Sequence, residues 1–129
     1  MERWLTHEGH WKEPGGYHNF PVSNLIRGAL ALERNGYDVF RRFPELFEAT
    51  YAMLKYSFPN LNVSAFGDTG RASQSPMTLE AGLAIAAKYE RPELGGLMSA
   101  MNALIDGGKY KREESGHNHN HCNGMAMEF

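Results

Sequence analysis

Three histidines near the C-terminus carry the clearest chemical potential in this sequence. His117, His119 and His121 occupy every second position of the polar tract 116–123. In an extended chain alternate side chains point to the same face, so the three imidazoles would face one way. Imidazole nitrogens are common zinc ligands. The spacing therefore indicates either a metal site, with Cys122 as a secondary ligand, or a polar loop that holds no metal.

A second candidate lies near the N-terminus, where Tyr17 follows two glycines and precedes His18. A tyrosine can act as a general base and then as a general acid when nearby positive groups favour its ionised form. The alternative is that Tyr17 is an aromatic residue packing this segment on the first helix. Trp4 and Trp11 have the same two interpretations, because a tryptophan ring can stack on a sugar or fill a core.

The third candidate is the glycine-containing stretch 66–71, Phe-Gly-Asp-Thr-Gly-Arg. It lacks the Lys-Ser/Thr pair of a phosphate-binding loop, so the sequence gives little support to nucleotide binding. Asp68 and Arg71 are able to form an internal ion pair. Arg71 is equally suited to bind an anionic substrate through a bidentate contact.

Composition limits the class of protein that presents these residues. The 129 residues suit a single domain, and 13 Lys+Arg against 15 Asp+Glu exclude a strongly basic nucleic-acid binder. No apolar run reaches the length of a membrane-spanning helix. The single cysteine excludes a disulfide framework, and the N-terminus does not resemble a signal peptide. The histidines are confined to the two ends of the chain, which favours a functional role for both ends.

The spacing of apolar residues predicts four helices joined as antiparallel hairpins. The expected helices are 22–35, 38–57, 78–89 and 92–105. The intervening stretch 59–77 is expected to be a long irregular loop, which is typical of functional segments. After a charged linker, Met125, Met127 and Phe129 alternate with other residues, a pattern that predicts the start of a β-strand.

Three of these segments, in this order, resemble the heparinase II/III-like polysaccharide lyases. They are Gly16-Tyr17-His18-Asn19, Phe66-Gly67-Asp68 and Asn118-His119-Asn120-His121. The resemblance implies a mainly α fold, in which residues 1–112 form antiparallel α-hairpins of an (α/α) toroid. Residues 113–129 would begin a C-terminal antiparallel β-sandwich domain. The chain is accordingly expected to be a fragment of a longer enzyme and inactive by itself.

The resemblance also implies an activity, the β-elimination of a uronic-acid-containing polysaccharide of the heparin/heparan sulfate, chondroitin or alginate type. Tyr17 would be the catalytic base and acid, and His119 a second catalytic residue. His121 would be a ligand of a structural zinc ion. The residues expected to bind substrate are Trp11, His18, Arg71 and Asn118.

The expected partner is an acidic polysaccharide rather than a nucleic acid or a membrane, and a homodimer is left open. A periplasmic or secreted location follows from the resemblance. Two functions of other classes remain as alternatives. One is a noncatalytic carbohydrate-binding helical module that uses Trp4, Trp11 and Tyr17 as stacking surfaces. The other is a small metal-binding helical protein built around the C-terminal histidines.

Overall fold

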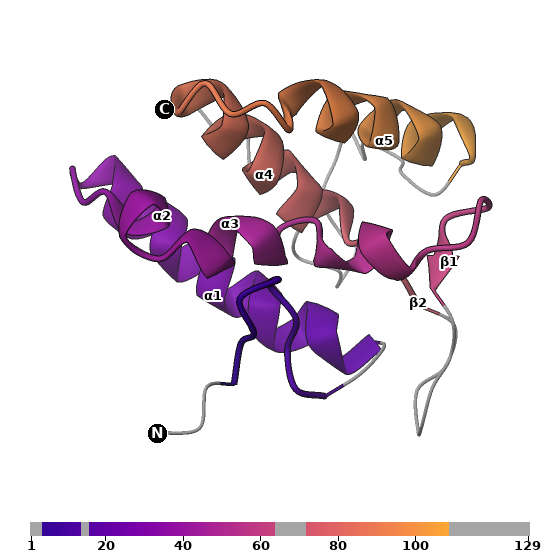
Figure 1. Ribbon diagram of the computed structural model, residues 1–129, viewed down its shortest axis with the longest axis horizontal. Coiled ribbons are helices and arrows are strands. Elements are labelled where there is room, and N and C mark those ends of the chain that lie inside the picture. The colour runs from indigo at the N-terminus through magenta and orange to yellow at the C-terminus, as the bar shows by residue number, and fades with distance from the viewer. Residues whose placement is uncertain (1–3, 14–15, 64–71, 109–129) are drawn as a thin grey trace, which may run out of the picture.

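The computed structural model describes residues 4–13, 16–63 and 72–108, and this part of the chain is mainly helical (Figure 1). The fold class predicted from the sequence is therefore confirmed. No helix in the described ranges is both long and apolar enough to span a membrane. The elements, in chain order, are α1 (Gly16–Arg34), α2 (Val39–Arg42), α3 (Pro44–Ala49), the 3-10 helix η1 (Ala52–Tyr56), β1 (Asn62–Val63), β2 (Ala72–Ser73), α4 (Pro76–Lys88) and α5 (Leu94–Asp106).

Helix α1 begins at Gly16 rather than at the predicted Val22, so Tyr17 and His18 lie in its first turn and not in a preceding loop. Pro21 lies inside the helix. Because proline has no main-chain N–H, the carbonyl of Tyr17 lacks the usual helical donor four residues ahead. The first turn of α1 therefore lacks one hydrogen bond of its own ladder.

The prediction of one helix over 38–57 was wrong about continuity, because the structure divides this stretch into α2, α3 and η1. Phe43 separates the first two with φ −129° and ψ 77°. The ring of Pro44 disfavours helical geometry in the residue before it, which explains the break. Tyr51, with φ −131° and ψ 12°, separates α3 from η1.

The predicted loop 59–77 is partly ordered into a small antiparallel ladder. Asn62 pairs with Ser73 and Val63 with Ala72. Beyond β2, the buried Gln74 donates hydrogen bonds to the carbonyl of Thr50 at 2.7 Å and to Oγ1 of Thr78 at 2.8 Å. These bonds fix the entry into α4, which begins at Pro76.

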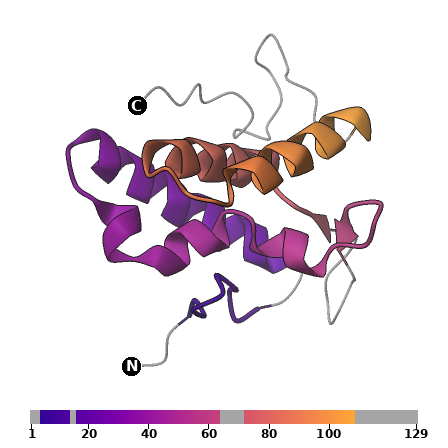
Figure 2. The ribbon, with the colours of Figure 1, turned by 45° about the horizontal axis from the view of Figure 1, so that its top comes forward.

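Helix α4 is the centre of the core and packs against α1, α3 and α5 (Figure 2). Its approach to α3 is close at Gly82, where an added Cβ would lie 2.4 Å from Oγ1 of Thr50. The largest apolar side chains of α1, α4 and α5 that are almost completely buried include Val22, Ile26, Leu30, Leu79, Ile85 and Leu104. The aromatic cluster and the pocket described below lie on the surface around this core.

Candidate functional site

The N-terminal loop, residues 4–13, presents the aromatic residues singled out from the sequence. It folds back on itself through an antiparallel bridge between Leu5 and Trp11. The N–H of Thr6 donates to the carbonyl of His10 at 2.8 Å, and the N–H of His10 donates to Oγ1 of Thr6 at 3.0 Å. The loop therefore has a defined conformation although it contains no helix or extended strand.

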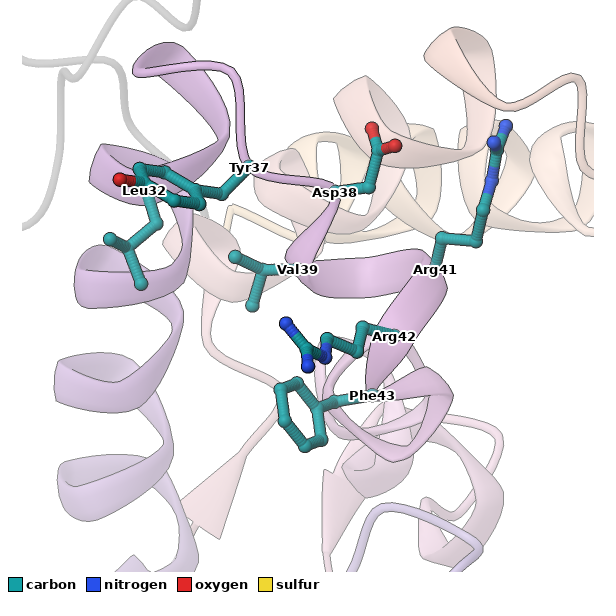
Figure 3. Close-up of a pocket in the computed structure, with 7 residues that line it drawn as sticks. All are labelled: Leu32, Tyr37, Asp38, Val39, Arg41, Arg42 and Phe43. Carbon is teal, nitrogen blue, oxygen red and sulfur yellow. The ribbon is translucent and has the colours of Figure 1, made fainter.

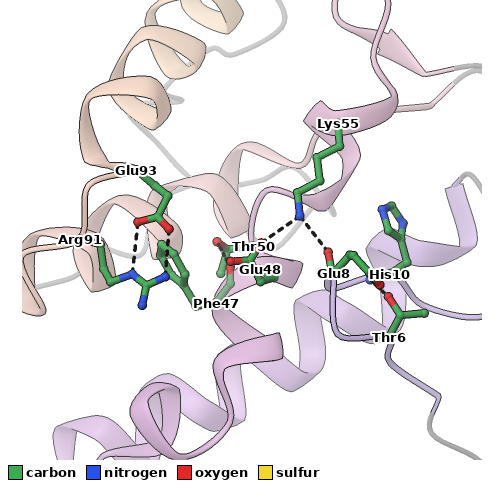
Figure 4. A network of polar contacts seen from close by, with 9 residues as sticks. All are labelled: Thr6, Glu8, His10, Phe47, Glu48, Thr50, Lys55, Arg91 and Glu93. Carbon is green, nitrogen blue, oxygen red and sulfur yellow. Dashed lines mark hydrogen bonds and ion pairs between the residues drawn. The ribbon is translucent and has the colours of Figure 1, made fainter.

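Two residues fasten the N-terminal loop to α3 and η1. Gly9 has a φ of +80°, and a Cβ added there would lie 2.2 Å from the main-chain nitrogen of Ala49. Only glycine satisfies both the positive φ and the close approach. Lys55 donates from Nζ to the carbonyl of Glu8 at 3.1 Å and to Oε2 of Glu48 at 2.9 Å (Figure 4). These contacts fix the position of the N-terminal loop relative to α3 and η1.

The loop and the helices together form an aromatic cluster that consists of Trp4, His10, Trp11, His18 and Tyr56. The Trp4 and Trp11 rings are stacked, with centroids 5.5 Å apart and an interplanar angle of 23°. His10 meets the Tyr56 ring edge-on at 4.2 Å and lies 5.8 Å from the His18 ring. Trp4 and Tyr56 are each 56% exposed, so the cluster presents aromatic surface to solvent, and Nζ of Lys12 lies 5.6 Å from the centroid of the Trp4 ring. Such faces are suited to stack on sugar rings.

His18, predicted to bind substrate, is the buried member of this cluster, with 2% of its surface exposed. Its Nδ1 accepts a hydrogen bond of 3.1 Å from the N–H of Trp11. Burial, followed by repulsion from His10, lowers the pKa of His18 to about 4, against a smaller opposing effect of the Ala49 main chain. The imidazole is therefore neutral at neutral pH and positions Trp11. Direct substrate contact by His18 stays a prediction.

Tyr17 lies beside His18 in the chain but points outward, with 52% of its surface exposed. A ligand lying on the N-terminal face of the molecule is therefore able to reach its hydroxyl. Trp11, predicted to bind substrate, is half-buried under the Trp4 ring. The catalytic role of Tyr17 and the substrate contact of Trp11 stay predictions.

Two polar atoms of the aromatic cluster have unmet hydrogen-bonding capacity. Nε2 of His10 and Nε1 of Trp11 are buried and have no hydrogen-bond partner among the described residues. Buried polar atoms are nearly always hydrogen-bonded in native proteins, by protein or by ordered water. Burial, and then Lys55, lower the pKa of His10, so a neutral ring is favoured. A hydroxyl-rich ligand or ordered water is the chemistry that would satisfy both atoms.

The remaining predicted site residues, Arg71, Asn118, His119 and His121, lie outside the described residues. The histidine tract and the predicted strand at 125–129 lie there too, as does the predicted domain boundary after residue 112. Within the described ranges, no group of three or more His, Cys, Asp or Glu side chains is arranged to hold a metal ion. Of the predicted site residues, the structure brings Trp11 and His18 together. The metal site and the domain boundary stay predictions.

Sequence reasoning did not find His10, Lys55 and Tyr56 as parts of this site. The residue types alone carried a weak signal, because His10 lies beside Trp11 and Tyr56 follows a lysine at the end of a helical stretch. Their meeting depends on the close seat of Gly9 on α3. That contact joins segments distant in the sequence, which periodicity does not reveal.

The family described as "Endo-acting ulvan lyase 2nd domain" matches residues 7–127. The chain belongs to this family. It is a polysaccharide lyase family, so the general class predicted from the sequence is confirmed, whereas the match does not support the narrower heparinase II/III-like assignment. No curated protein and no solved structure matches the chain.

Proposed function

We propose that this chain is part of a lyase that cleaves a uronic-acid-containing polysaccharide by β-elimination, with Tyr17 as base and acid. The observation that carries the proposal is the position of Tyr17, which is exposed in the first turn of α1 immediately before the residue that anchors the aromatic cluster. Membership of a polysaccharide lyase family supports the reaction class. The helices would belong to the (α/α) toroid that the sequence resemblance implies.

In the proposed reaction the phenolate of Tyr17 removes the proton from C5 of the uronate. The electrons of the broken C5–H bond pass into the carboxylate to give an enolate-like intermediate, and they then form the C4–C5 double bond as the C4–O bond to the leaving sugar breaks. The phenol of Tyr17 then gives its proton to the departing oxygen, so that the protons balance. The intermediate carries negative charge on the uronate carboxylate, which must be stabilised by hydrogen-bond donors or cations.

The described residues contribute binding and orientation to this reaction. The stacked Trp4 and Trp11 rings offer a platform for sugar faces, and His18 holds Trp11 in place through its main chain. From the sequence resemblance, His119 is proposed as a second catalytic residue, and Asn118 and Arg71 as residues that bind the acidic substrate. His121 is proposed to hold a structural zinc ion, and no step of the reaction depends on that ion.

The family name makes ulvan the first polymer to test, and heparin, chondroitin sulfate and alginate are the alternatives that the sequence resemblance implies. A periplasmic or secreted enzyme is expected from the sequence resemblance. The tryptophan pair, of which Trp4 is the exposed member, would equally suit a noncatalytic carbohydrate-binding module. Catalysis therefore has to be measured separately from binding.

The test is to incubate the full-length protein, shown to be folded by circular dichroism, with each of the four polymers. Formation of the unsaturated uronate is followed by its ultraviolet absorbance. We expect the absorbance to rise with at least one polymer. Folded protein that binds a polymer but yields no unsaturated product with any of them would contradict the lyase proposal and favour the binding module.

A further inference from the structure

A pocket lies at the opposite end of α1 from Tyr17, and we name it the α1–α2 pocket. It has a volume of about 390 Å³ and is lined by Leu32, Tyr37, Asp38, Val39, Arg41, Arg42 and Phe43 (Figure 3). At a helical rise of about 1.5 Å per residue, Leu32 lies roughly 22 Å along α1 from Tyr17. The pocket is therefore separate from the aromatic cluster.

The walls of the α1–α2 pocket are apolar and aromatic, and they are created by the sharp turn after α1. Gly36, with a φ of +86°, reverses the chain, and the N–H of Tyr37 donates to the carbonyl of Leu32 at 3.1 Å. Tyr37 is 62% exposed and Phe43 is 47% exposed. Exposed rings of this kind, on either side of a hollow with Val39 beneath, provide flat surfaces for a ring-shaped ligand.

Arg42 brings a positive charge to the aromatic wall of the pocket. Its guanidinium extends beside the Phe43 ring (Figure 3) and makes no hydrogen bond or ion pair within the described part of the chain. Among the other charged lining residues, Asp38 lies 3.2 Å from the Tyr89 hydroxyl and shares that hydroxyl's proton with Glu33, and Arg41 lies 5.1 Å over the Tyr89 ring. Arg42 is thus the cation that lies beside the aromatic wall of the pocket with its donors available to a ligand.

Arg41 extends the positive character of this face beyond the pocket. It also lines an adjacent cavity of about 210 Å³, together with Arg91 and Tyr89. Arg91 is paired with Glu93 at 2.9 Å, so its charge is largely balanced. The lining of the α1–α2 pocket combines two cations, Arg41 and Arg42, with one carboxylate, Asp38, and its net charge of +1 favours an anion there.

We propose that the α1–α2 pocket binds one acidic sugar residue of a polysaccharide chain, away from the site of cleavage. Arg42 binds the carboxylate or sulfate group through its guanidinium fork, and Tyr37 and Phe43 contact the faces of the sugar ring. An arginine beside aromatic walls fits a ligand that is both ring-shaped and anionic. The inference rests on the proposed function in one respect, which is that the substrate is an acidic polysaccharide.

The test measures binding rather than turnover. Isotope-labelled protein is titrated with alginate oligosaccharides, which carry carboxylates only, and with carrageenan oligosaccharides, which carry sulfate esters only. Amide shifts of residues 37–43 report the pocket. A Trp4→Ala background removes the competing platform. We expect saturable shifts with at least one of the two ligands, and that ligand identifies the anionic group.

Arg42→Gln is expected to weaken the binding at the pocket by about tenfold or more, and Tyr37→Ala to weaken it severalfold. Arg34→Gln is the matched control, because it removes the same charge from the end of α1 without lining the pocket. Unchanged affinity in Arg42→Gln would overturn the proposal, as would the absence of pocket shifts in the parent protein. Product formation in the lyase assay would then leave the proposed function standing.

Discussion

The main-chain N–H of Trp11 donates a hydrogen bond of 3.1 Å to Nδ1 of His18, and this bond joins the N-terminal loop to the first turn of α1. Because Nδ1 is the acceptor, the ring proton of the neutral imidazole lies on Nε2, on the side of the Ala49 main chain. Protonating Nδ1 would remove the acceptor. The geometry of the aromatic cluster therefore depends on His18 staying neutral.

We expect the stability of the protein to fall as the pH is lowered from 7 to 5. The pKa of His18 is lowered to about 4 in the folded protein, so the unfolded state takes up the proton first. The free energy of unfolding is expected to fall by about 2 kcal/mol between pH 7 and pH 5. Burial also lowers the pKa of His10, which adds in the same direction.

This pH dependence is measured by urea denaturation at each pH. His18→Asn keeps a hydrogen-bond acceptor near the position of Nδ1 but does not titrate, so its stability should change less between pH 7 and pH 5. His7→Gln removes an exposed histidine from the same loop and serves as the control. Equal slopes in the parent and in His18→Asn would contradict the assignment.

Gly9→Ala is expected to detach the N-terminal loop from α3. The new Cβ would collide with the main chain of Ala49. The substitution would also place a residue other than glycine at a φ of +80°, which is strained. The expected cost is about 2–4 kcal/mol. Gly36→Ala is the control, because it has a similar φ of +86° with no atom within 4 Å, and should cost only about 1–2 kcal/mol. Thermal denaturation compares the two variants, and equal losses would show that the close approach is unimportant.

The fold was predictable where the apolar spacing is regular, and less so where a local residue decides. The helices around Leu79–Ile85 and Leu97–Leu104 were placed within a few residues because their buried side chains recur at helical spacing. The break at Phe43 follows from Pro44, which begins α3 and whose ring disfavours helical geometry in the residue before it. The extra turns before Val22 follow from tertiary contacts of His18 that no local pattern reveals.

The candidate site was predictable only in part, for a similar reason. Trp11 and Tyr17 were found because aromatic residues near glycines are conspicuous in a sequence. His10 and Tyr56 were missed because their 4.2 Å contact exists only after α3 and η1 have formed. Arg42 carried no sequence signal, since an arginine at the end of a short helix is ordinarily a solvated surface residue.

Glu33 is expected to be important for stability rather than for activity. Its carboxylate is buried and accepts hydrogen bonds from Lys88, from the hydroxyl of Tyr89 at 3.0 Å and from the N–H of Phe40 at 3.0 Å. Burial raises the pKa of Glu33, but hydrogen bonds from Lys88, Phe40 and Tyr89 outweigh it, so the net pKa lies below the usual value. The stabilisation is therefore present at neutral pH and is lost as the pH falls through that lowered pKa.

Glu33→Ala should cost about 2–3 kcal/mol at pH 7, because it leaves the N–H of Phe40 and the partly buried Lys88 without their acceptor. Glu33→Gln keeps the shape and should cost less. Asp106→Asn, which removes an exposed carboxylate at the end of α5, is the control. Chemical denaturation measures all three, and a loss in Glu33→Ala no larger than in Asp106→Asn would contradict this role.

Trp4→Ala is expected to weaken polysaccharide binding by about five- to tenfold while leaving the fold intact. The ring is 56% exposed and stacks on Trp11, so its removal opens the platform without opening the core. Phe20→Ala removes another exposed ring, outside the aromatic cluster, and is the control. Calorimetry with polymer fragments gives the affinities. An equal loss in both variants would show that binding does not depend on the tryptophan pair.

Tyr17→Phe is expected to lower kcat of the full-length lyase by about 10²- to 10⁴-fold, because it removes the group proposed to move the proton. Polymer affinity and melting temperature should stay close to those of the parent. The ring remains, it is half-exposed, and its hydroxyl makes no hydrogen bond with the described residues.

Tyr37→Phe removes a hydroxyl from an exposed tyrosine at the other end of α1 and keeps the ring that the α1–α2 pocket uses. It should therefore retain turnover. Initial rates of unsaturated-uronate formation, measured above and below KM, separate kcat from binding in both variants. A Tyr17→Phe enzyme with near-parent kcat would assign the proton transfer to another residue, whereas a loss of binding alone would make Tyr17 part of the sugar platform.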